Sequence, residues 1–355
     1  MEFELIEKVI LRCDGSRRMG LGHLVRCAML ASNLAPGRSR LVCREDTLVR
    51  RFIEERGLEA VFIPASCSEE DEPEFIASLA AGDGTQFAIL DRRDNSREYV
   101  AGLARAGLFV VDIEDRGEGR NEAHILIDCH IWPGSAESAF RGRALCGFGP
   151  DWALLDPRYA RAAACLNRTP SSERLTAVRD IVVSLGGSDP SGLTATVLSQ
   201  LDRVNGDFRI SLAAGPGVDC SGLKCRFHEL RVLRGLRSLD EVFSKAQLAI
   251  AGGGVTMLEA LCLGLSVLVV PQHREQYVNA ARFALRACLS LVPPPETADH
   301  RERLFRALEQ LIEDPALRVA LASAGASLVD GRGIERLAGA MAYLENARRE
   351  KVSLI

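Results

Sequence analysis

The chain has 355 residues and a formal net charge of −4, and these values already exclude several classes of protein. Hydrophobic residues make up 47% and charged residues 26%, which is typical of a globular protein of about two domains and excludes a disordered or collagen-like chain. The slight acidic excess disfavours a dedicated nucleic-acid-binding protein, because such proteins carry a basic excess. No apolar run reaches the ~18 residues of a transmembrane helix, so no membrane span is expected.

Eleven cysteines are spread along the chain, several of them within apolar runs. Residues 1–10 carry three glutamates and lack the basic n-region of a secretory signal. Reduced thiols in a cytoplasmic protein are therefore expected. The nearest approach to a zinc half-site is Cys220, Cys225 and His228, and buried small hydrophobic residues are the alternative reading.

Strand-like and helix-like segments alternate through the first half of the chain. Short apolar runs predict strands, and apolar residues three and four apart predict helices between them. This alternation predicts a parallel sheet with helices on both faces. The predicted strands are 9–11, 39–43, 60–63, 87–90, 108–111 and 125–127, and the predicted helices are 24–34, 47–56 and 97–106.

A polar segment, 166–179, interrupts the pattern and predicts a linker. A second α/β series follows it. We therefore expect two Rossmann-like, doubly wound α/β domains, 1–165 and 180–333, facing across a cleft, and a C-terminal helix, 334–355, that is long enough to cross back to the first domain. The predicted strands of the second series are 181–185, 209–213, 248–250, 266–270 and 289–292, and its predicted helices are 193–201, 239–245, 255–263, 276–287, 300–313 and 334–350.

The first candidate site follows the first predicted strand, in residues 12–23 (RCDGSRRMGLGH). Glycines allow a tight turn, and the start of a helix offers free N–H groups to a phosphate or a developing anion. A dinucleotide fingerprint is incomplete, because position 25 is valine, so nicotinamide binding has weak support. A tight turn with a helix-capping histidine is the alternative. The polar residues of this loop are His23 and Asp14, with the cationic Arg12, Arg17 and Arg18.

Three polar loops follow strands of the second half. Residues 184–192 (SLGGSDPSG) offer small residues for an anion-binding concavity, although a helix start capped by Asp189 is the alternative. Residues 251–260 (AGGGVTMLEA) hold three successive glycines, which are costly unless the backbone must approach another group closely. Residues 271–279 (PQHREQYVN) follow the next strand. Because the three loops share one sheet edge, we expect a single site that fits a sugar nucleotide, with Glu259 on the ribose.

The order of these motifs resembles one family of nucleotide-sugar enzymes. Arg-x-Asp…Gly-x-Gly-His, Gly-Gly-Ser-Asp-Pro and Ala-Gly-Gly-Gly-x-Thr-x-x-Glu stand within residues 10–284 as they do in the UDP-sugar hydrolases of pseudaminic acid biosynthesis (PseG type) and the related SpsG spore-coat polysaccharide family. The MurG-like N-acetylglucosaminyltransferases are more distantly similar. Residues 146–155 resemble that family's segment between the domains. The resemblance implies a GT-B fold, no metal, no cofactor and hydrolysis of a sugar–UDP bond to free sugar and UDP, in nonulosonic-acid or surface polysaccharide biosynthesis.

The resemblance also implies a role for each matching residue. His23, with Asp14 in the same loop, would be the general base that activates water, a role that histidine commonly fills. The implied nucleotide-binding positions are Gly186, Gly187, Ser188, Gly252, Gly253, Gly254, Thr256 and Glu259. The implied sugar-binding positions are Arg12, Gly22, Asp91, Arg93, Glu275, Gln276 and Asn279.

The chain departs from the family pattern at two places. Asp91-Arg92-Arg93 stands where the hydrolases carry Asp-His-Tyr, and Glu275-Gln276 stands where they carry Asn-Gln. The two arginines either recognise an acidic group on a sugar or acceptor or are solvated surface charge. Three functions stay open: a nucleotide-sugar hydrolase, a glycosyltransferase that uses the same base toward a hydroxyl acceptor, and a non-catalytic sensor. The sugar, the nucleotide, the acceptor and the oligomeric state are not indicated.

Two further clusters have the residue types of metal sites, but ordinary polar residues at strand ends explain both. In chain order the two clusters are Asp112, Glu114 and Asp115, and then His124, Asp128 and His130.

The acidic run 69–72, which precedes a proline, predicts a solvated turn.

Overall fold

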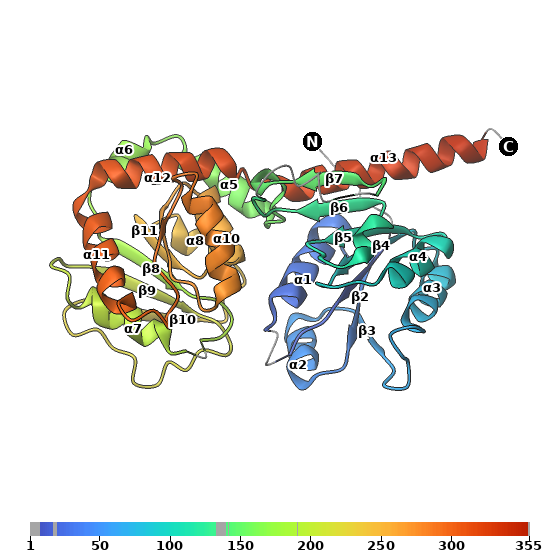
Figure 1. Ribbon diagram of the computed structural model, residues 1–355, viewed down its shortest axis with the longest axis horizontal. Helices are drawn as coiled ribbons and strands as arrows, with labels where there is room; N and C mark the ends of the chain where they lie inside the picture. Colours follow the sequence, from blue (N-terminus) through green and yellow to red (C-terminus); the bar gives the residue numbers. More distant parts are fainter. Residues whose placement is uncertain (1–7, 17–19, 133–139, 141, 190, 354–355) are drawn as a thin grey trace. The chain divides into compact units, whose positions relative to one another are not determined.

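The structure is a computed structural model that describes residues 8–16, 20–132, 140, 142–189 and 191–353. Arg17 and Arg18 of the first motif, and Pro190 of the second, lie outside the described residues. The chain divides into two compact units, Met1–Asp156 with Arg332–Ile355, and Pro157–Gly331. Each unit is an α/β domain built on its own sheet (Figure 1).

The first unit is built on a seven-stranded parallel sheet with the order β3-β2-β1-β4-β5-β6-β7. The order reverses between β1 and β4, and open α/β sheets bind ligands beyond the carboxyl ends of the strands at such a switch point. The strands are β1 (Val9–Cys13), β2 (Ser39–Arg44), β3 (Ala60–Ile63), β4 (Phe87–Asp91), β5 (Phe109–Ile113), β6 (Ile125–Asp128) and β7 (Leu145–Phe148). The α-helices are α1 (Gly22–Leu34), α2 (Thr47–Arg56), α3 (Glu72–Asp83), α4 (Arg97–Arg105) and α13 (Gly333–Ser353).

Helices cover both faces of this sheet, which explains why its strands read as continuous apolar runs. On one face, α1, α2 and α13 pack in a core that includes Leu24, Phe52 and Leu337. On the other face, α3 and α4 contribute Ile76 and Leu103. The helix expected at 334–355 therefore packs on the first unit.

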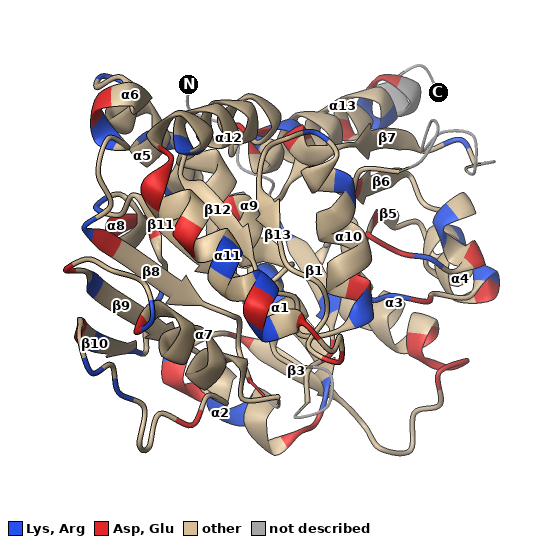
Figure 2. Ribbon diagram, turned by 60° about the vertical axis from the view of Figure 1, so that its left-hand side comes forward, with Lys and Arg blue, Asp and Glu red and all other residues tan. Residues whose placement is uncertain are grey.

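The second unit is built on a six-stranded parallel sheet with the order β10-β9-β8-β11-β12-β13, so its switch point lies between β8 and β11. Figure 2 shows that β11 and β12 carry no charged residue, whereas charges lie on the surrounding helices and loops. The strands are β8 (Asp180–Ser184), β9 (Arg209–Ala214), β10 (Glu229–Arg234), β11 (Leu248–Ala251), β12 (Ser266–Val269) and β13 (Ser290–Leu291). The helices are α5 (Pro157–Leu166), α6 (Ser171–Arg174), α7 (Leu193–Leu201), α8 (Asp240–Phe243), α9 (Val255–Cys262), α10 (Arg274–Ala284), α11 (His300–Glu313) and α12 (Pro315–Leu328).

The domain boundary differs from the one expected from the sequence. The second unit begins at residue 157, and the expected linker, 166–179, lies inside it. Arg318 of α12 is 1% exposed and donates to the carbonyl oxygens of Leu175 at 2.9 Å and Thr176 at 2.6 Å. This polar segment is therefore ordered because its backbone supplies the acceptors of a buried guanidinium. Among the described residues, no helix combines the length and the apolar character needed to cross a membrane.

Candidate functional site

His23 and Asp91 meet at the switch point of the first sheet. His23 is the second residue of α1, which follows β1, and Asp91 is the last residue of the neighbouring strand β4. Nδ1 of the imidazole lies 2.7 Å from Oδ1 of Asp91. The Asp91 side chain is fully buried, whereas His23 keeps 18% of its side chain exposed. Because an ionised carboxylate only accepts hydrogen bonds, Nδ1 carries a proton, and in the neutral form of this imidazole the lone pair lies on Nε2.

Arg26 explains how Asp91 stays ionised in a buried position. It lies one helical turn after His23 and donates from Nε to Oδ2 of Asp91 at 2.8 Å and from Nη2 to Oδ1 at 2.7 Å. Burial would raise the pKa of Asp91, but the charge and hydrogen bonds of Arg26 and the hydrogen bond from His23 hold it well below its ordinary range. Nη1 of Arg26 also pairs with Oε1 of Glu114, which follows β5, at 2.8 Å. Sequence reasoning missed Arg26, although its position three residues after His23 places both on one helix face.

The turn before α1 is fixed by its own backbone. Ser16 and Gly20 exchange two backbone hydrogen bonds, and Gly20 has a φ of 80°, in the left-handed region that favours glycine. The N-cap residue Leu21 makes no side-chain hydrogen bond to the start of α1, and a Cβ added to Gly22 would meet no atom within 4 Å. The described residues thus leave open space at Gly22, next to His23.

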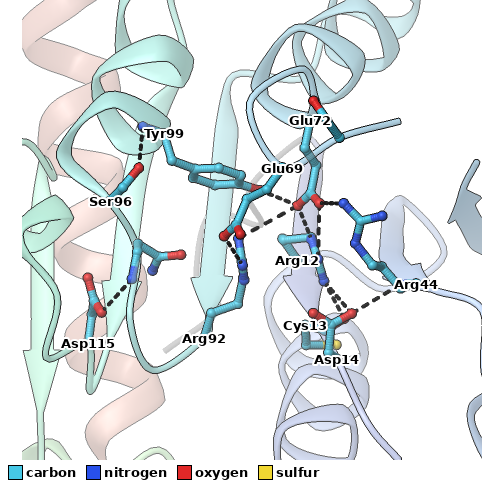
Figure 3. Close-up of polar contacts among 12 residues, drawn as sticks. Arg12, Cys13, Asp14, Arg44, Glu69, Glu72, Arg92, Ser96, Tyr99 and Asp115 are labelled. Carbon is cyan, nitrogen blue, oxygen red and sulfur yellow. Dashed lines mark hydrogen bonds and ion pairs between the residues drawn. The ribbon is translucent and has the colours of Figure 1, made fainter. Parts of the chain in front are cut away.

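Arg12 and Asp14 belong to a neighbouring buried cluster (Figure 3). Arg12 is 0% exposed, and its Nε donates to Oε1 of Glu72 at 2.5 Å while its Nη1 lies 2.7 Å from Oδ1 of Asp14. Asp14 also accepts from the backbone amide of Arg44 at 3.1 Å. The expectation that Arg12 contacts a sugar is wrong, because its guanidinium is buried against carboxylates. Asp14 forms an ion pair with Arg12, and these contacts hold the loop after β1 in place.

Glu72 lies at the centre of this cluster, so the expectation of a solvated turn at 69–72 is wrong at its last residue. The Glu72 side chain is 0% exposed, and it accepts from the hydroxyl of Tyr99 at 2.6 Å and from Nη2 of Arg44 at 2.8 Å. Arg92 lies over the Tyr99 ring, and its Nη2 reaches the exposed Glu69 at 2.6 Å. Arg92 is therefore part of this network rather than solvated surface charge.

The glycines after β11 form the centre of the site in the second unit. A Cβ added to Gly252 would lie 2.6 Å from the carbonyl oxygen of Leu185, in the loop after the neighbouring strand β8. A Cβ added to Gly253 would lie 2.7 Å from the carbonyl oxygen of Gln276. By contrast, Gly254 is exposed and has open space at its Cβ position. Two glycines thus allow close packing, and the third borders the space that a ligand can enter.

Side-chain amides of the loop after β12 and of α10 brace this glycine loop. Oε1 of Gln276 accepts from the amide of Gln272 at 2.9 Å and from that of Gly253 at 3.4 Å, and Nδ2 of Asn279 donates to the Gly253 carbonyl at 3.4 Å. Nε2 of Gln272 donates to two carbonyls of the loop after β8, each at 2.7 Å. These contacts hold the loops together, and sugar binding by Gln276 and Asn279 stays a prediction.

Helix α9 presents an uncapped N-terminus. Its N-cap is Gly254, no side chain caps it, and its first turn contains no acidic residue. Thr256 lies in that first turn and Glu259 in the next, both partly exposed. Such a helix start attracts phosphate through its unpaired amides and the positive end of the helix dipole. Burial and the neighbouring Glu259 carboxylate raise the pKa of Tyr159, which lies on α5.

The loop after β8 contains Asp189, whose side chain caps the start of the following helix α7. Asp189 accepts from the amides of Leu193 at 2.8 Å and Thr194 at 2.7 Å, so a carboxylate already occupies the start of α7. The Gly187 carbonyl accepts from the amide of Gly217 at 2.9 Å. Contact of Gly186, Gly187 and Ser188 with a nucleotide therefore stays a prediction. Arg93 and Glu275, where the chain departs from the family pattern, are both exposed.

Alanine at Gly253 and alanine at Gly254 are expected to have opposite consequences. Gly253→Ala forces a Cβ onto the Gln276 backbone, and we expect overpacking to lower the free energy of unfolding by about 1–3 kcal/mol. Gly254→Ala meets open space, so we expect a change in stability within about 0.5 kcal/mol but weaker nucleotide binding. Urea unfolding and calorimetric titration with UDP measure the two effects. Equal loss of stability in both variants would contradict this assignment.

The clusters noted in the sequence for their metal-ligand residue types, for which ordinary polar residues are the preferred interpretation, do not assemble as metal sites. His228 donates from Nε2 to the carbonyl of Leu201 at 2.9 Å, and Nδ1 of His124 accepts from the amide of Val110 at 3.0 Å. Asp112 accepts from the side chain of Asn95 at 3.1 Å, whereas Glu114 pairs with Arg26. Within the described ranges, one group has ligand atoms close enough together for a metal ion. It takes one residue from each of the two clusters and adds a cysteine that neither cluster included. Its members are Glu114, Cys129 and His130.

Comparison with solved structures decides the class of fold. MurG of Acinetobacter baumannii matches with a TM-score of 0.66 at 12% identity, over 94% of this chain and 98% of that one. The chain has the GT-B fold. A UDP-GlcNAc 2-epimerase from Neisseria meningitidis, solved with bound UDP-GlcNAc, matches with a TM-score of 0.55 at 11% identity, over 94% of this chain and 100% of that one. The predicted pair of Rossmann-like α/β domains is confirmed.

Sequence comparison gives the same class. Residues 181–329 of this GT-B chain match the glycosyltransferase family 28 C-terminal domain, which covers most of the second unit. The spore coat polysaccharide biosynthesis protein SpsG of Bacillus subtilis is 25% identical over 338 residues, 91% of this chain and 94% of that protein. The uncharacterized protein MJ1062 of Methanocaldococcus jannaschii is 24% identical over 284 residues, 76% of this chain, and the match spans only 56% of that longer protein. The chain is thus glycosyltransferase-like.

Proposed function

We propose that the protein hydrolyses a nucleotide-activated amino sugar, UDP-linked, at the anomeric carbon, and releases free sugar and UDP. The observation that carries the proposal is the His23–Asp91 pair, in which a buried carboxylate held by Arg26 orients a partly exposed imidazole. A protein that only senses a sugar nucleotide needs no such pair. The similarity to the spore coat polysaccharide biosynthesis protein SpsG supports a place in surface polysaccharide biosynthesis.

His23 acts as the general base in this proposal. Asp91 accepts a hydrogen bond from Nδ1–H, so Nε2 takes a proton from water while the water oxygen attacks the anomeric carbon. The bond between that carbon and the diphosphate oxygen breaks, and its electron pair leaves with UDP. Asp91 stabilises the imidazolium that forms, and His23 then returns its proton to solvent. Arg12 and Asp14 are positioning residues in this proposal, because their ion pair holds the loop that leads to His23.

The second unit binds the nucleotide in this proposal. The diphosphate lies against the open backbone at Gly254 and the uncapped start of α9, where amide dipoles stabilise the negative charge that develops on the leaving group. Gly252, Gly253 and Thr256 complete this loop, and Glu259 binds the ribose. Sugar contacts are proposed for Gly22 and Arg93 in the first unit and for Glu275, Gln276 and Asn279 in the second, whereas the buried Asp91 acts through His23.

Transfer of the sugar to a hydroxyl acceptor is the second candidate, and the match of residues 181–329 to a glycosyltransferase domain favours it. The same base and the same diphosphate site serve both reactions, and only the nucleophile differs. The two reactions are separated by leaving out the acceptor. A hydrolase releases UDP in water alone, whereas a transferase waits for its acceptor.

His23→Ala is expected to lower acceptor-free UDP release from a panel of UDP-linked amino sugars by about 10²–10⁴-fold, the usual contribution of a general base. Calorimetric titration with UDP is expected to give the wild-type affinity, because the nucleotide-binding loops of the proposal contain no atom of His23. Undiminished release by the variant would refute His23 as the base. Nucleotide binding by wild type without any release would favour a transferase or a sensor.

A further inference from the structure

Glu114, Cys129 and His130 come together at the carboxyl edge of the first sheet. Glu114 follows β5, and Cys129 and His130 follow β6, its parallel neighbour. A carboxylate oxygen, the sulfur and an imidazole nitrogen of these residues all lie within 4.8 Å of one another. Sγ of Cys129 lies 3.0 Å from Oε1 of Glu114, and Cys129 is 7% exposed. Three different donor atoms are thus gathered in one small volume.

A carboxylate holds the imidazole of this group. Nδ1 of His130 lies 2.6 Å from Oδ1 of Asp128, and Oδ2 of Asp128 accepts from Nε1 of Trp132 at 2.9 Å. Histidines that bind metals usually donate their second ring N–H to a carboxylate in this way, which fixes the ring and leaves the other nitrogen for the ion. Nε2 of His130 is therefore the nitrogen available for a ligand.

The carboxylate of the group is also held in place. Arg26 pairs with Oε1 of Glu114 at 2.8 Å, and the Glu114 amide donates to the carbonyl of Ile127 at 2.8 Å. Glu114 has a φ of 54°, a left-handed conformation that non-glycine residues adopt rarely. The local charge balance is negative, because three carboxylates, those of Asp91, Glu114 and Asp128, outnumber the two guanidinium groups of Arg26 and Arg116. A cation added here would meet more negative than positive charge.

We propose that Glu114, Cys129 and His130 bind a divalent transition-metal ion, with Zn²⁺ as the expected occupant. Carboxylate oxygen, thiolate sulfur and imidazole nitrogen are the zinc ligands of proteins, and three of them leave the fourth tetrahedral position for a water or a substrate oxygen. On binding, the S–H bond of Cys129 breaks, the thiolate takes the ion, and the proton passes to solvent. Arg26 and Asp91 connect this site to His23. The inference goes beyond the proposed hydrolysis and departs from the absence of metal that the family resemblance implies.

Zinc titration of the metal-free full chain against a chromophoric chelator tests the proposal without any activity readout. The wild type is expected to bind one tight equivalent, and Cys129→Ser and His130→Ala to lose it. Asp128→Asn, which removes the orienting carboxylate, is expected to weaken binding by about 10–100-fold. Cys165→Ser is the matched control, because Cys165 is an exposed thiol on α5, and it is expected to bind as the wild type does.

Cobalt substitution keeps the test decisive if a variant folds poorly, as judged by circular dichroism. Wild type and Cys165→Ser are expected to show the near-ultraviolet charge-transfer absorption of a thiolate–cobalt bond, and each bound ion to release a proton. The absence of tight stoichiometric zinc binding by the wild type would overturn the proposal. So would a charge-transfer band that persists in folded Cys129→Ser, since another of the eleven cysteines would then be the ligand.

Discussion

Asp91→Asn is expected to lower kcat for acceptor-free UDP release by about 10²–10⁴-fold while leaving the affinity for UDP unchanged. The amide group of asparagine carries no charge, so it cannot stabilise the imidazolium that His23 becomes when it takes a proton from water. It can also present its NH₂ group to the ring and favour the wrong tautomer. A residue that only supports the fold would change stability and binding together, so the separation of kcat from affinity identifies the positioning role.

The same substitution also removes the counter-charge of a buried guanidinium. Breaking a buried ion pair costs about 3–5 kcal/mol, and we expect the lower end because Glu114 still pairs with Arg26 at 2.8 Å. Rates are therefore compared at a temperature where urea unfolding shows both proteins to be folded. Asp94→Asn is the matched control, since Asp94 is exposed three residues further along the chain, and it is expected to keep the wild-type rate. Wild-type kcat in folded Asp91→Asn would contradict the mechanism.

Glu72→Gln is expected to cause the largest loss of stability, about 3–5 kcal/mol in the free energy of unfolding. Glu72 accepts from Arg12, Arg44 and Tyr99 and is fully buried (Figure 3). A glutamine keeps the shape but removes the charge, which leaves Asp14 as the remaining carboxylate partner of the buried Arg12. Urea unfolding measures the loss.

Glu69→Gln is the matched control for this cluster. Glu69 also pairs with an arginine, Arg92 at 2.6 Å, but its side chain is 62% exposed. Solvent screens such a pair, so we expect a change within about 0.5 kcal/mol. Equal effects of the two substitutions would show that the buried network does not stabilise the unit.

The pH dependence of the Glu72 effect has a definite sign. Burial opposes ionisation, but the hydrogen bond and charge of Arg12 and the hydrogen bond from Tyr99 lower the pKa of Glu72 below its ordinary 4.5. The stability that the carboxylate contributes is therefore fully present above pH 4.5 and is lost as the pH falls through the lowered value. The difference between wild type and Glu72→Gln is expected to shrink in that acidic window and to stay constant near neutral pH.

The two sheets could be predicted because their strands are buried on both faces and form apolar runs between helices. Strand β10 was missed because it lies at the edge of its sheet and mixes three charged residues with three apolar ones, as its sequence ELRVLR shows. Helix α3 was missed because its start lies in an acidic run, and nothing local shows that Glu72 meets a buried arginine from β1. Local patterns thus predict elements better than they predict long-range ion pairs.

The candidate site shows the same limit. His23 and the loop at Gly252–Gly254 follow strands next to the two switch points, and that position is readable from the order of motifs. The partners are not readable, because they come from distant segments. Arg12 was expected at a sugar and lies buried, whereas Arg26 received no role and holds Asp91. Nothing in the sequence distinguishes Cys129 from the other cysteines in apolar segments. The pairing of β5 with β6 brings it beside Glu114.

The most direct test of the central claim is acceptor-free turnover of a UDP-linked amino sugar in water labelled with oxygen-18 (the heavy oxygen), followed by mass spectrometry of both products. Hydrolysis by His23 acting on water at the anomeric carbon predicts rapid release of free sugar, with the heavy oxygen on the sugar and none in the phosphates of UDP. Heavy oxygen in the UDP would show attack at phosphorus, and the absence of release without an acceptor would show that water is not the nucleophile. Either result would contradict the proposed function.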